Sequence, residues 1–275
     1  MRKLVVLCAV LFMSGMYSFA QTPKIIAHRG AWKNTHVPQN SIASLQAAIQ
    51  QKAWGSEFDV QLTKDEVLVV NHDDDFYGID IATSTYQELL AKKHPNGESI
   101  PTLEAYIQAA MSQNVTKLVL EVKPSKLGTE RTLQTVALIV PLVKKLKAAD
   151  HLVYISFSYE ACLKLRELDK NAHIQYLSFQ LPAKVDPAKL KDPAFSQYAA
   201  GVKTPQELKM VGLSGFDYQM KLLKDQATYI EDAKKIGVAS NVWTVNKEED
   251  LQFFIDHHID YITTDEPELL HKLLQ

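Results

Sequence analysis

Two carboxylates stand two residues apart in the stretch SEFDVQL, which runs from Ser56 to Leu62. The stretch is typical of a β-strand, and side chains alternate between the two faces of a strand, so Glu57 and Asp59 point to the same side. Like charges repel, and burying either carboxylate is costly unless a positive charge compensates it. The pair therefore indicates a bound cation or a set of basic partners.

A second strand-like stretch, KLVLEVK, repeats this spacing with Glu121 and Lys123. Glu57, Asp59 and Glu121 would then form a cluster of three carboxylates. Ligation by oxygen alone suits a hard divalent cation, Mg²⁺ or Ca²⁺, rather than Zn²⁺. On spacing alone, a structural network in which Arg29 and Lys123 pair with the first two carboxylates explains the pattern equally well.

Two other strand-like stretches end in histidine: KIIAHRG contains His28, and VLVVNHD contains His72. A single histidine at a strand end is more often structural than catalytic. Together with an acidic cluster and two cations, however, the pair fits phosphoryl transfer. A metal ion, Arg29 and Lys123 would neutralise the phosphate, and the two imidazoles would move the protons.

These stretches belong to a regular alternation of strand-like and helix-like segments, which predicts parallel strands joined by helical crossovers. About eight such units in roughly 250 residues match a (β/α)8 TIM barrel. A doubly wound open sheet is the alternative, although no glycine-rich phosphate loop follows the first strand. In a barrel, the carboxyl ends of the strands meet around one active site, so the polar strand ends would be neighbours.

Three segments need separate comment. Residues 74–100 form an excursion, a small insertion after the strand that ends in His72, and residues 182–203 form a polar loop with three prolines. The sequence TERTLQTVALIVPLVKKLKAA predicts a long helix interrupted at Pro141. No second long apolar segment, low-complexity tract or linker divides the chain, so residues 21–275 are expected to form one domain.

The first 20 residues have the features of a signal peptide: basic Arg2 and Lys3, an apolar run, and a small-x-small cleavage site that ends at Ala20. The apolar run is too short to span a bilayer comfortably, although an uncleaved anchor is the alternative. We expect export to the periplasm or the medium, without stable membrane insertion after cleavage. Cys162 is then the one cysteine left, which excludes an internal disulfide.

Composition is ordinary for a globular chain of 275 residues, with 46% hydrophobic and 23% charged residues. The formal net charge is −2 at pH 7, so nothing suggests a nucleic-acid partner. The expected partner is a small molecule. The oligomeric state cannot be inferred from the sequence.

An ordered set of motifs resembles the glycerophosphodiester phosphodiesterase family: IIAHRG, PQNS, SEFDVQLTKDEVLVVNHD, IPTLEAYI, LEVK, WTVN and TTDEP. The resemblance covers nearly the whole chain after residue 20. It implies a phosphodiesterase TIM barrel with an insertion after the HD motif, and hydrolysis of glycerophosphodiesters to glycerol 3-phosphate and an alcohol. It also implies one divalent cation, Ca²⁺ or Mg²⁺, and favours the metal over the ion-pair network.

The resemblance also implies a role for each matching residue. Its metal-binding carboxylates match Glu57, Asp59 and Glu121, and its catalytic histidines match His28 and His72. Its basic phosphate contacts match Arg29 and Lys123, and the aromatic residue of its WTVN motif matches Trp243, which could otherwise only cap the barrel core.

The sequence departs from the family pattern twice. The family usually has PEN after HRG, whereas Gln39 stands here between Pro38 and Asn40, so an ion pair from this loop is in doubt. The family often has an arginine after NHD, whereas DDDFYGID is acidic and aromatic, so the preference for an alcohol headgroup cannot be carried over. A lyase that forms a cyclic phosphate and a catalytically silent, ligand-binding relative are the alternative functions.

Overall fold

The structure is a computed structural model that describes residues 22–179, 187–193 and 195–275. The predicted signal peptide, residues 1–20, lies outside the described residues, as does part of the loop at 182–203. No helix in the described ranges is both long and apolar enough to cross a membrane.

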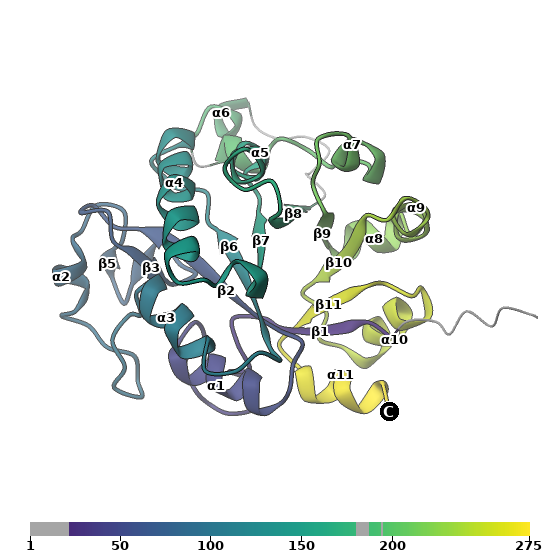
Figure 1. Cartoon of the computed structure of the whole chain (residues 1–275), viewed down its shortest axis with the longest axis horizontal. Coiled ribbons are helices and arrows are strands. Elements are labelled where there is room, and N and C mark those ends of the chain that lie inside the picture. Colours follow the sequence, from purple (N-terminus) through teal and green to yellow (C-terminus); the bar gives the residue numbers. More distant parts are fainter. Residues whose placement is uncertain (1–21, 180–186, 194) are drawn as a thin grey trace, which may run out of the picture.

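Eight parallel strands among the described residues close into a barrel, since β1 pairs with β2 on one side and with β11 on the other. The predicted TIM-barrel fold is therefore confirmed (Figure 1). In order around the barrel, the strands are β1 (Lys24–Ala27), β2 (Gly55–Leu62), β6 (Lys117–Val122), β7 (Leu152–Ser156), β8 (His173–Ser178), β9 (Gly215–Gln219), β10 (Ala239–Trp243) and β11 (Tyr261–Thr264).

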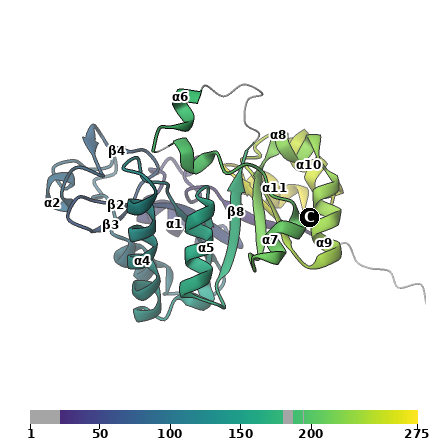
Figure 2. The same cartoon turned by 90° about the horizontal axis from the view of Figure 1, so that it is seen from above.

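Helices follow the strands and cover the outside of the barrel (Figures 1 and 2). They are α1 (Ile42–Gln50), α3 (Leu103–Ala110), α4 (Thr129–Lys145), α5 (Tyr159–Leu168), α7 (Pro205–Met210), α8 (Met220–Asp225), α9 (Thr228–Ile236), α10 (Glu248–Asp256) and α11 (Pro267–Leu273). Shorter helices are η1 (Ala149–His151), α6 (Pro187–Leu190) and η2 (Phe195–Tyr198).

The large apolar core lies between the strands and these helices, and a small one fills the barrel itself. Alternation along each strand produces this division: Phe58 and Val60 of β2 belong to the outer core, whereas Ile26, Val119 and Leu177 belong to the inner one. Glu57 and Asp59, which alternate with Phe58 and Val60 along β2, therefore face the barrel interior.

The strand before His72 is not part of the barrel. It is β3 (Leu68–Val70), which pairs antiparallel with β2 at its outer edge. The excursion at residues 74–100 continues from it with the hairpin β4 (Asp75–Phe76) and β5 (Ile79–Asp80) and the short helix α2 (Tyr86–Leu89), which enclose a separate apolar cluster.

The predicted interruption at Pro141 is wrong, because α4 runs through this residue without a break. Pro141 lies on the exposed face of the helix, and so does Ala137, whose carbonyl loses its usual hydrogen-bond donor. Because that carbonyl can be hydrated, the missing hydrogen bond is tolerated. The buried face, with Val136, Ile139 and Val140, stays continuous.

Candidate active site

Polar side chains from several strands meet at the carboxyl end of the barrel, around a cavity of about 330 Å³. Every site residue assigned from the sequence lines this cavity except Asp59, which is buried in contact with two of the lining residues, Arg29 and Lys123. The residues that line it are His28, Arg29, Glu57, His72, Glu121, Lys123, Ile155, Phe157, Leu177, Tyr198, Asp217, Trp243, Thr244 and Thr263.

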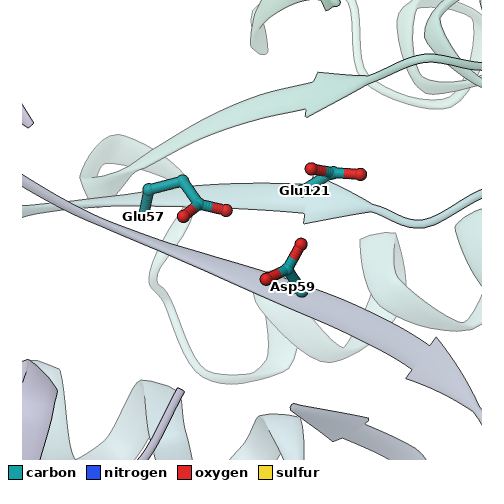
Figure 3. A group of neighbouring side chains, drawn as sticks. All are labelled: Glu57, Asp59 and Glu121. Atoms are coloured by element: carbon teal, nitrogen blue, oxygen red, sulfur yellow. The ribbon is translucent and has the colours of Figure 1, made fainter. Parts of the chain in front are cut away.

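The three predicted carboxylates form one cluster. Glu57 and Asp59 point to the same side of β2, and Asp59 is the register partner of Glu121 on the neighbouring strand β6. One oxygen from each group lies within 4.8 Å of the others, and all three side chains are buried. Figure 3 shows the carboxylates converging from the two adjacent strands, in an arrangement that can hold a metal ion.

The pKa values of the cluster show that its charge is incompletely balanced by the protein. Burial, together with the negative charge of Asp59, raises the pKa of Glu57 well above its ordinary value. Burial also raises the pKa of Glu121, to about 7, against the opposing effect of Lys123. A hard divalent cation would stabilise the ionised forms of both groups, and the donor set of carboxylate oxygens suits Mg²⁺ or Ca²⁺.

Asp59 is the carboxylate best supplied with partners. Lys123 Nζ lies 3.5 Å from Asp59 Oδ1, and Arg29 Nε lies 3.7 Å from Asp59 Oδ2. Asn40 donates a hydrogen bond from Nδ2 to Asp59 Oδ2 at 2.8 Å. Burial opposes ionisation, but Lys123 first, with His72, Arg29 and Asn40, holds the pKa of Asp59 far below its ordinary value. Asp59 is therefore ionised at neutral pH.

The two basic residues contact the same cluster and also face the cavity. Lys123 Nζ lies 3.2 Å from Glu121 Oε1, and the charges of Glu121 and Asp59 raise the pKa of Lys123 although burial lowers it. Arg29 donates its backbone N–H to Glu57 Oε2 at 2.8 Å. Arg29 and Lys123 supply two positive charges against three carboxylates, so the cluster could also hold a metal ion.

The turn after β1 places Arg29, and glycine is required there. Gly30 has a φ of +81°, and a Cβ atom at this position would lie 2.5 Å from Ser44 Oγ in α1. Arg29 itself has a φ of +54°. Its guanidinium donates from Nη1 to Gln39 Oε1 at 2.8 Å, so Gln39 holds Arg29 through a hydrogen bond with a neutral acceptor, without an ion pair.

His28 is held from behind by an acidic residue. Its Nδ1 lies 2.7 Å from Asp265 Oδ1, and Asp265 Oδ2 accepts a hydrogen bond from Asn246 Nδ2 at 2.7 Å. Burial opposes ionisation of Asp265, but the contact with His28 and the bond from Asn246 lower its pKa. An ionised Asp265 favours the tautomer with the proton on Nδ1, which leaves Nε2 as the basic atom toward the cavity.

His72 lies in the loop after β3 and lines the same cavity. Its Nδ1 lies 2.8 Å from Asp73 Oδ1, and burial lowers its pKa. Gln61 fixes this loop, because its Nε2 donates to the backbone carbonyls of Asn71 and Asp73 at 3.0 and 2.6 Å. The two histidines thus approach the cavity from different elements, β1 and the β3 loop.

Away from the carboxylate cluster, the cavity wall is largely apolar. Trp243 stands edge-on to Phe157 with ring centroids 5.4 Å apart, and Phe157 also contacts Tyr198 of η2. Burial raises the pKa of the Tyr198 hydroxyl to about 12, so it is neutral. Trp243, which the family resemblance assigns to substrate contact, lines the cavity, and so does Tyr198, which nothing in the sequence pattern indicated.

A second hollow of about 590 Å³ lies beside His72. Asp73, the hydrogen-bond partner of that histidine, lines it, and so do Trp32, Gln39, Tyr77 and His94 among others. It lies between the β1–α1 connection and the excursion at residues 74–100. Asn71 and Asp73 thus line the second hollow, whereas His72 between them lines the main cavity.

Sequence reasoning missed several residues that the geometry places in or behind the site. Asn40 had no assigned role, although its position in PQNS next to the departure at Gln39 was a usable signal. Asn246 and Asp265 belong to the WTVN and TTDEP motifs, but nothing in the sequence pairs Asp265 with His28. No sequence pattern indicated Asp217 of β9, which is buried and lines the cavity. Burial, with a contribution from Glu121, raises its pKa well above the ordinary value.

Fold and site together define a TIM-barrel enzyme whose acidic, basic and imidazole groups meet at the carboxyl ends of the strands. The model of the glycerophosphoryl diester phosphodiesterase family matches residues 28–269. The chain therefore belongs to this family, and the resemblance seen in the motifs is confirmed.

Individual relatives agree with this assignment. A crystal structure of a glycerophosphodiester phosphodiesterase from Parabacteroides distasonis is 39% identical, with a TM-score of 0.81 over 92% of this chain and 97% of that one. A glycerophosphodiester phosphodiesterase from Caldanaerobacter subterraneus is 27% identical over 91% of this chain and 97% of the relative. An Oleispira antarctica phosphodiesterase solved in complex with the product sn-glycerol-3-phosphate is 25% identical, with a TM-score of 0.73 over 92% and 97% of the chains.

Proposed function

We propose that this enzyme hydrolyses glycerophosphodiesters to sn-glycerol 3-phosphate and an alcohol, with the help of one divalent cation. The observation that carries the proposal is the position of two histidines, from different elements, around a cluster of three carboxylates and two basic residues. Family membership supports it, as does the related Oleispira antarctica phosphodiesterase with its bound product.

The cation belongs at Glu57, Asp59 and Glu121. These groups fit a cation because they are buried and close together. Their three carboxylates also outnumber the two positive charges of Arg29 and Lys123. When bound, Mg²⁺ or Ca²⁺ would supply positive charge that offsets the negative charge growing on the phosphoryl oxygens. Arg29 and Lys123 face the same cavity and would orient and neutralise the phosphate.

Proton transfer falls to the two histidines. Hydrolysis needs a base to activate water and an acid to protonate the departing alkoxide. Asp265 orients His28 so that Nε2 can accept a proton, which favours His28 as the base. His72 lines the main cavity, and its hydrogen-bond partner Asp73 lines the second hollow, which offers space for a departing alcohol; this favours His72 as the acid.

Export is a further part of the proposal. Residues 1–20 carry the basic, apolar and small-x-small pattern of a signal peptide. An enzyme exported in this way would act in the periplasm or the medium, on diesters released from lipids outside the cytoplasm.

A product assay tests the function. The purified protein is incubated with a panel of glycerophosphodiesters, with and without a chelator, and the products are identified by ³¹P NMR. The expected product is sn-glycerol 3-phosphate, formed only when a divalent cation is present. A cyclic phosphate would instead identify the lyase, in which the substrate's own hydroxyl is the nucleophile. An absence of turnover with every diester and cation would identify a silent relative.

A further inference from the structure

Asp217 faces the barrel interior at the centre of β9. Its neighbours in the strand, Phe216 and Tyr218, pack into the outer core, so alternation directs Asp217 inward, where it lines the cavity. The residue is only 1% exposed, and its Oδ1 atom has no hydrogen-bond partner among the described residues. A buried carboxyl oxygen without a partner is rare in proteins and needs a reason.

Two polar side chains of the neighbouring strand β10, those of Asn241 and Trp243, donate hydrogen bonds to groups other than the Asp217 carboxyl. Its register partner Asn241 donates from Nδ2 to Gln175 Oε1 at 3.1 Å and accepts a bond from Thr263 Oγ1 at 3.3 Å. Trp243 donates its Nε1–H to the backbone carbonyl of Asp217, at 3.0 Å, rather than to the carboxyl group. The Oδ1 atom of Asp217 therefore lacks a donor among the described residues, and the residue lines the cavity.

Asp217 is also separate from the candidate cation site. The carboxylates that approach within 4.8 Å of one another are Glu57, Asp59 and Glu121, and Asp217 is not in this group. Its strand β9 is the fourth from β2 in both directions around the barrel, which places it across the cavity from Glu57 and Asp59. Asp217 is thus placed to accept a hydrogen bond from a neutral donor on the substrate and not to share a metal ion with the cluster.

The position across the cavity selects one part of the substrate. The phosphate would lie near Arg29 and Lys123, and the leaving alcohol on the side of His72 and the second hollow. The part of the substrate that stays bonded to the phosphate then points toward β9, between the apolar walls formed by Phe157, Leu177 and Trp243. A short polyol offers C–H groups to such walls and hydroxyl groups to a carboxyl.

We infer that Asp217 is a binding residue for the free hydroxyl groups of the glycerol moiety and selects substrates that carry them. The inference rests on the proposed function, since it assumes a glycerophosphodiester substrate. A hydroxyl group of the ligand donates to the unpartnered Oδ1 atom, so the buried carboxyl group is satisfied only when a polyol phosphate fills the cavity. A site built around a ligand hydroxyl discriminates strongly against analogues that lack it, because the buried polar group is then left unpaired.

Binding measurements test this without relying on turnover. The affinities of sn-glycerol 3-phosphate, propyl phosphate and inorganic phosphate are measured by isothermal titration calorimetry for the wild type, Asp217→Leu and Asp217→Asn. Wild type should bind glycerol 3-phosphate about 10- to 100-fold more tightly than propyl phosphate, which lacks the hydroxyl groups. Asp217→Leu should abolish this ratio and change the affinity for inorganic phosphate by less than about threefold.

Asp217→Asn keeps a carbonyl acceptor and should retain more of the preference than Asp217→Leu. If Asp217→Leu does not fold, the inference is tested by the affinity ratio of glycerol 3-phosphate to propyl phosphate in the wild type and by a smaller ratio in Asp217→Asn. Equal affinities of the wild type for glycerol 3-phosphate and propyl phosphate would overturn the inference, as would an unchanged ratio in Asp217→Leu. A turnover assay distinguishes this inference from the proposed function. If the wild type shows the binding preference but hydrolyses no glycerophosphodiester, the proposed function is refuted, whereas Asp217 remains a residue that binds polyol phosphates.

Discussion

His28 Nδ1 and Asp265 Oδ1 lie 2.7 Å apart, although the two residues come from the first and the last strand–helix units of the chain. The contact exists because the barrel closes: β1 pairs with β11, and Ala27 is in register with Thr264. The strand pairing that closes the barrel therefore also brings Asp265 to the proposed base. The carboxylate fixes the imidazole tautomer, as acidic partners of catalytic histidines do in other enzymes.

Asp265→Asn tests whether this contact positions His28. The amide removes the charge and offers a donor where an acceptor is needed, so the imidazole should lose its favoured tautomer. We expect kcat to fall about 10- to 100-fold with KM little changed, because the loss is one of orientation rather than of binding. Glu266→Gln, at the adjacent half-buried residue that pairs with Lys33, is the matched control and should keep its kcat. An unchanged kcat in Asp265→Asn would refute the positioning role.

Glu57→Gln tests the cation site. The change nearly preserves shape but removes a charged ligand, so metal affinity should fall by at least the roughly 10- to 100-fold seen when a supporting group is lost. A cation that binds only the folded state stabilises it by about 2.7 kcal/mol when present at 100 times its Kd. Melting temperature should therefore rise with added Ca²⁺ or Mg²⁺ in the wild type and much less in Glu57→Gln.

The control for this experiment is Glu104→Gln, which removes a carboxylate on the surface of α3 that pairs with Lys145. It should show the same rise in melting temperature as the wild type. If Glu57→Gln responded to the cation as strongly as the control does, Glu57 would not be a ligand.

The acidic cluster could be predicted because its signal is local. Strand alternation alone places Glu57 beside Asp59, and the barrel needs only neighbouring strands to bring Glu121 to them. The environment of His72 could not be predicted in the same way. Its strand looks like a barrel strand in sequence, but it pairs antiparallel with β2 outside the barrel, and only long-range pairing decides that.

Asp217 escaped sequence reasoning for a related physical reason. In the sequence, a single aspartate between two aromatic residues is typical of the solvent-exposed face of an amphipathic strand. In a barrel, the inner face is as enclosed as the outer one, so the same pattern places a carboxyl in the interior. Recognition of Asp217 required the register with Leu177 and Asn241, which the sequence does not contain.

The raised pKa of Asp217 predicts how stability depends on pH. An aspartate ionises near pH 3.9 in the unfolded chain. Between that value and its higher pKa in the folded protein, the folded state holds a proton that the unfolded state has released, so stability falls as pH rises. Compared with Asp217→Asn, the wild type should lose up to about 1.4 kcal/mol of unfolding free energy per pH unit above pH 4. Urea denaturation of both proteins from pH 4 to pH 8 measures the difference, and parallel curves would show that Asp217 titrates normally.

Cleavage before Gln21 is the expected result of export. The motive is the small-x-small sequence Ser18-Phe19-Ala20 after the apolar run. Intact mass of the protein recovered from the periplasm or medium should correspond to residues 21–275. Ala20→Arg should block cleavage, because a bulky charged residue does not fit a site that requires small side chains. A membrane-bound product that still begins at Met1 would contradict the prediction and support the anchor.

The two histidines can be distinguished by the leaving group. A general acid contributes roughly 10²- to 10⁴-fold when it must protonate an alkoxide, and little when the leaving group is already stable. His72→Ala should therefore lose most activity on glycerophosphocholine and much less on bis(p-nitrophenyl) phosphate. His28→Ala should lose activity on both, because activation of water is needed whichever group departs. The reverse pattern would exchange the two roles. Large and equal losses for both variants on both substrates would mean that the histidines position the phosphate or the metal ion. His257→Ala, at an exposed histidine that lines neither the main cavity nor the second hollow, provides the baseline for these comparisons.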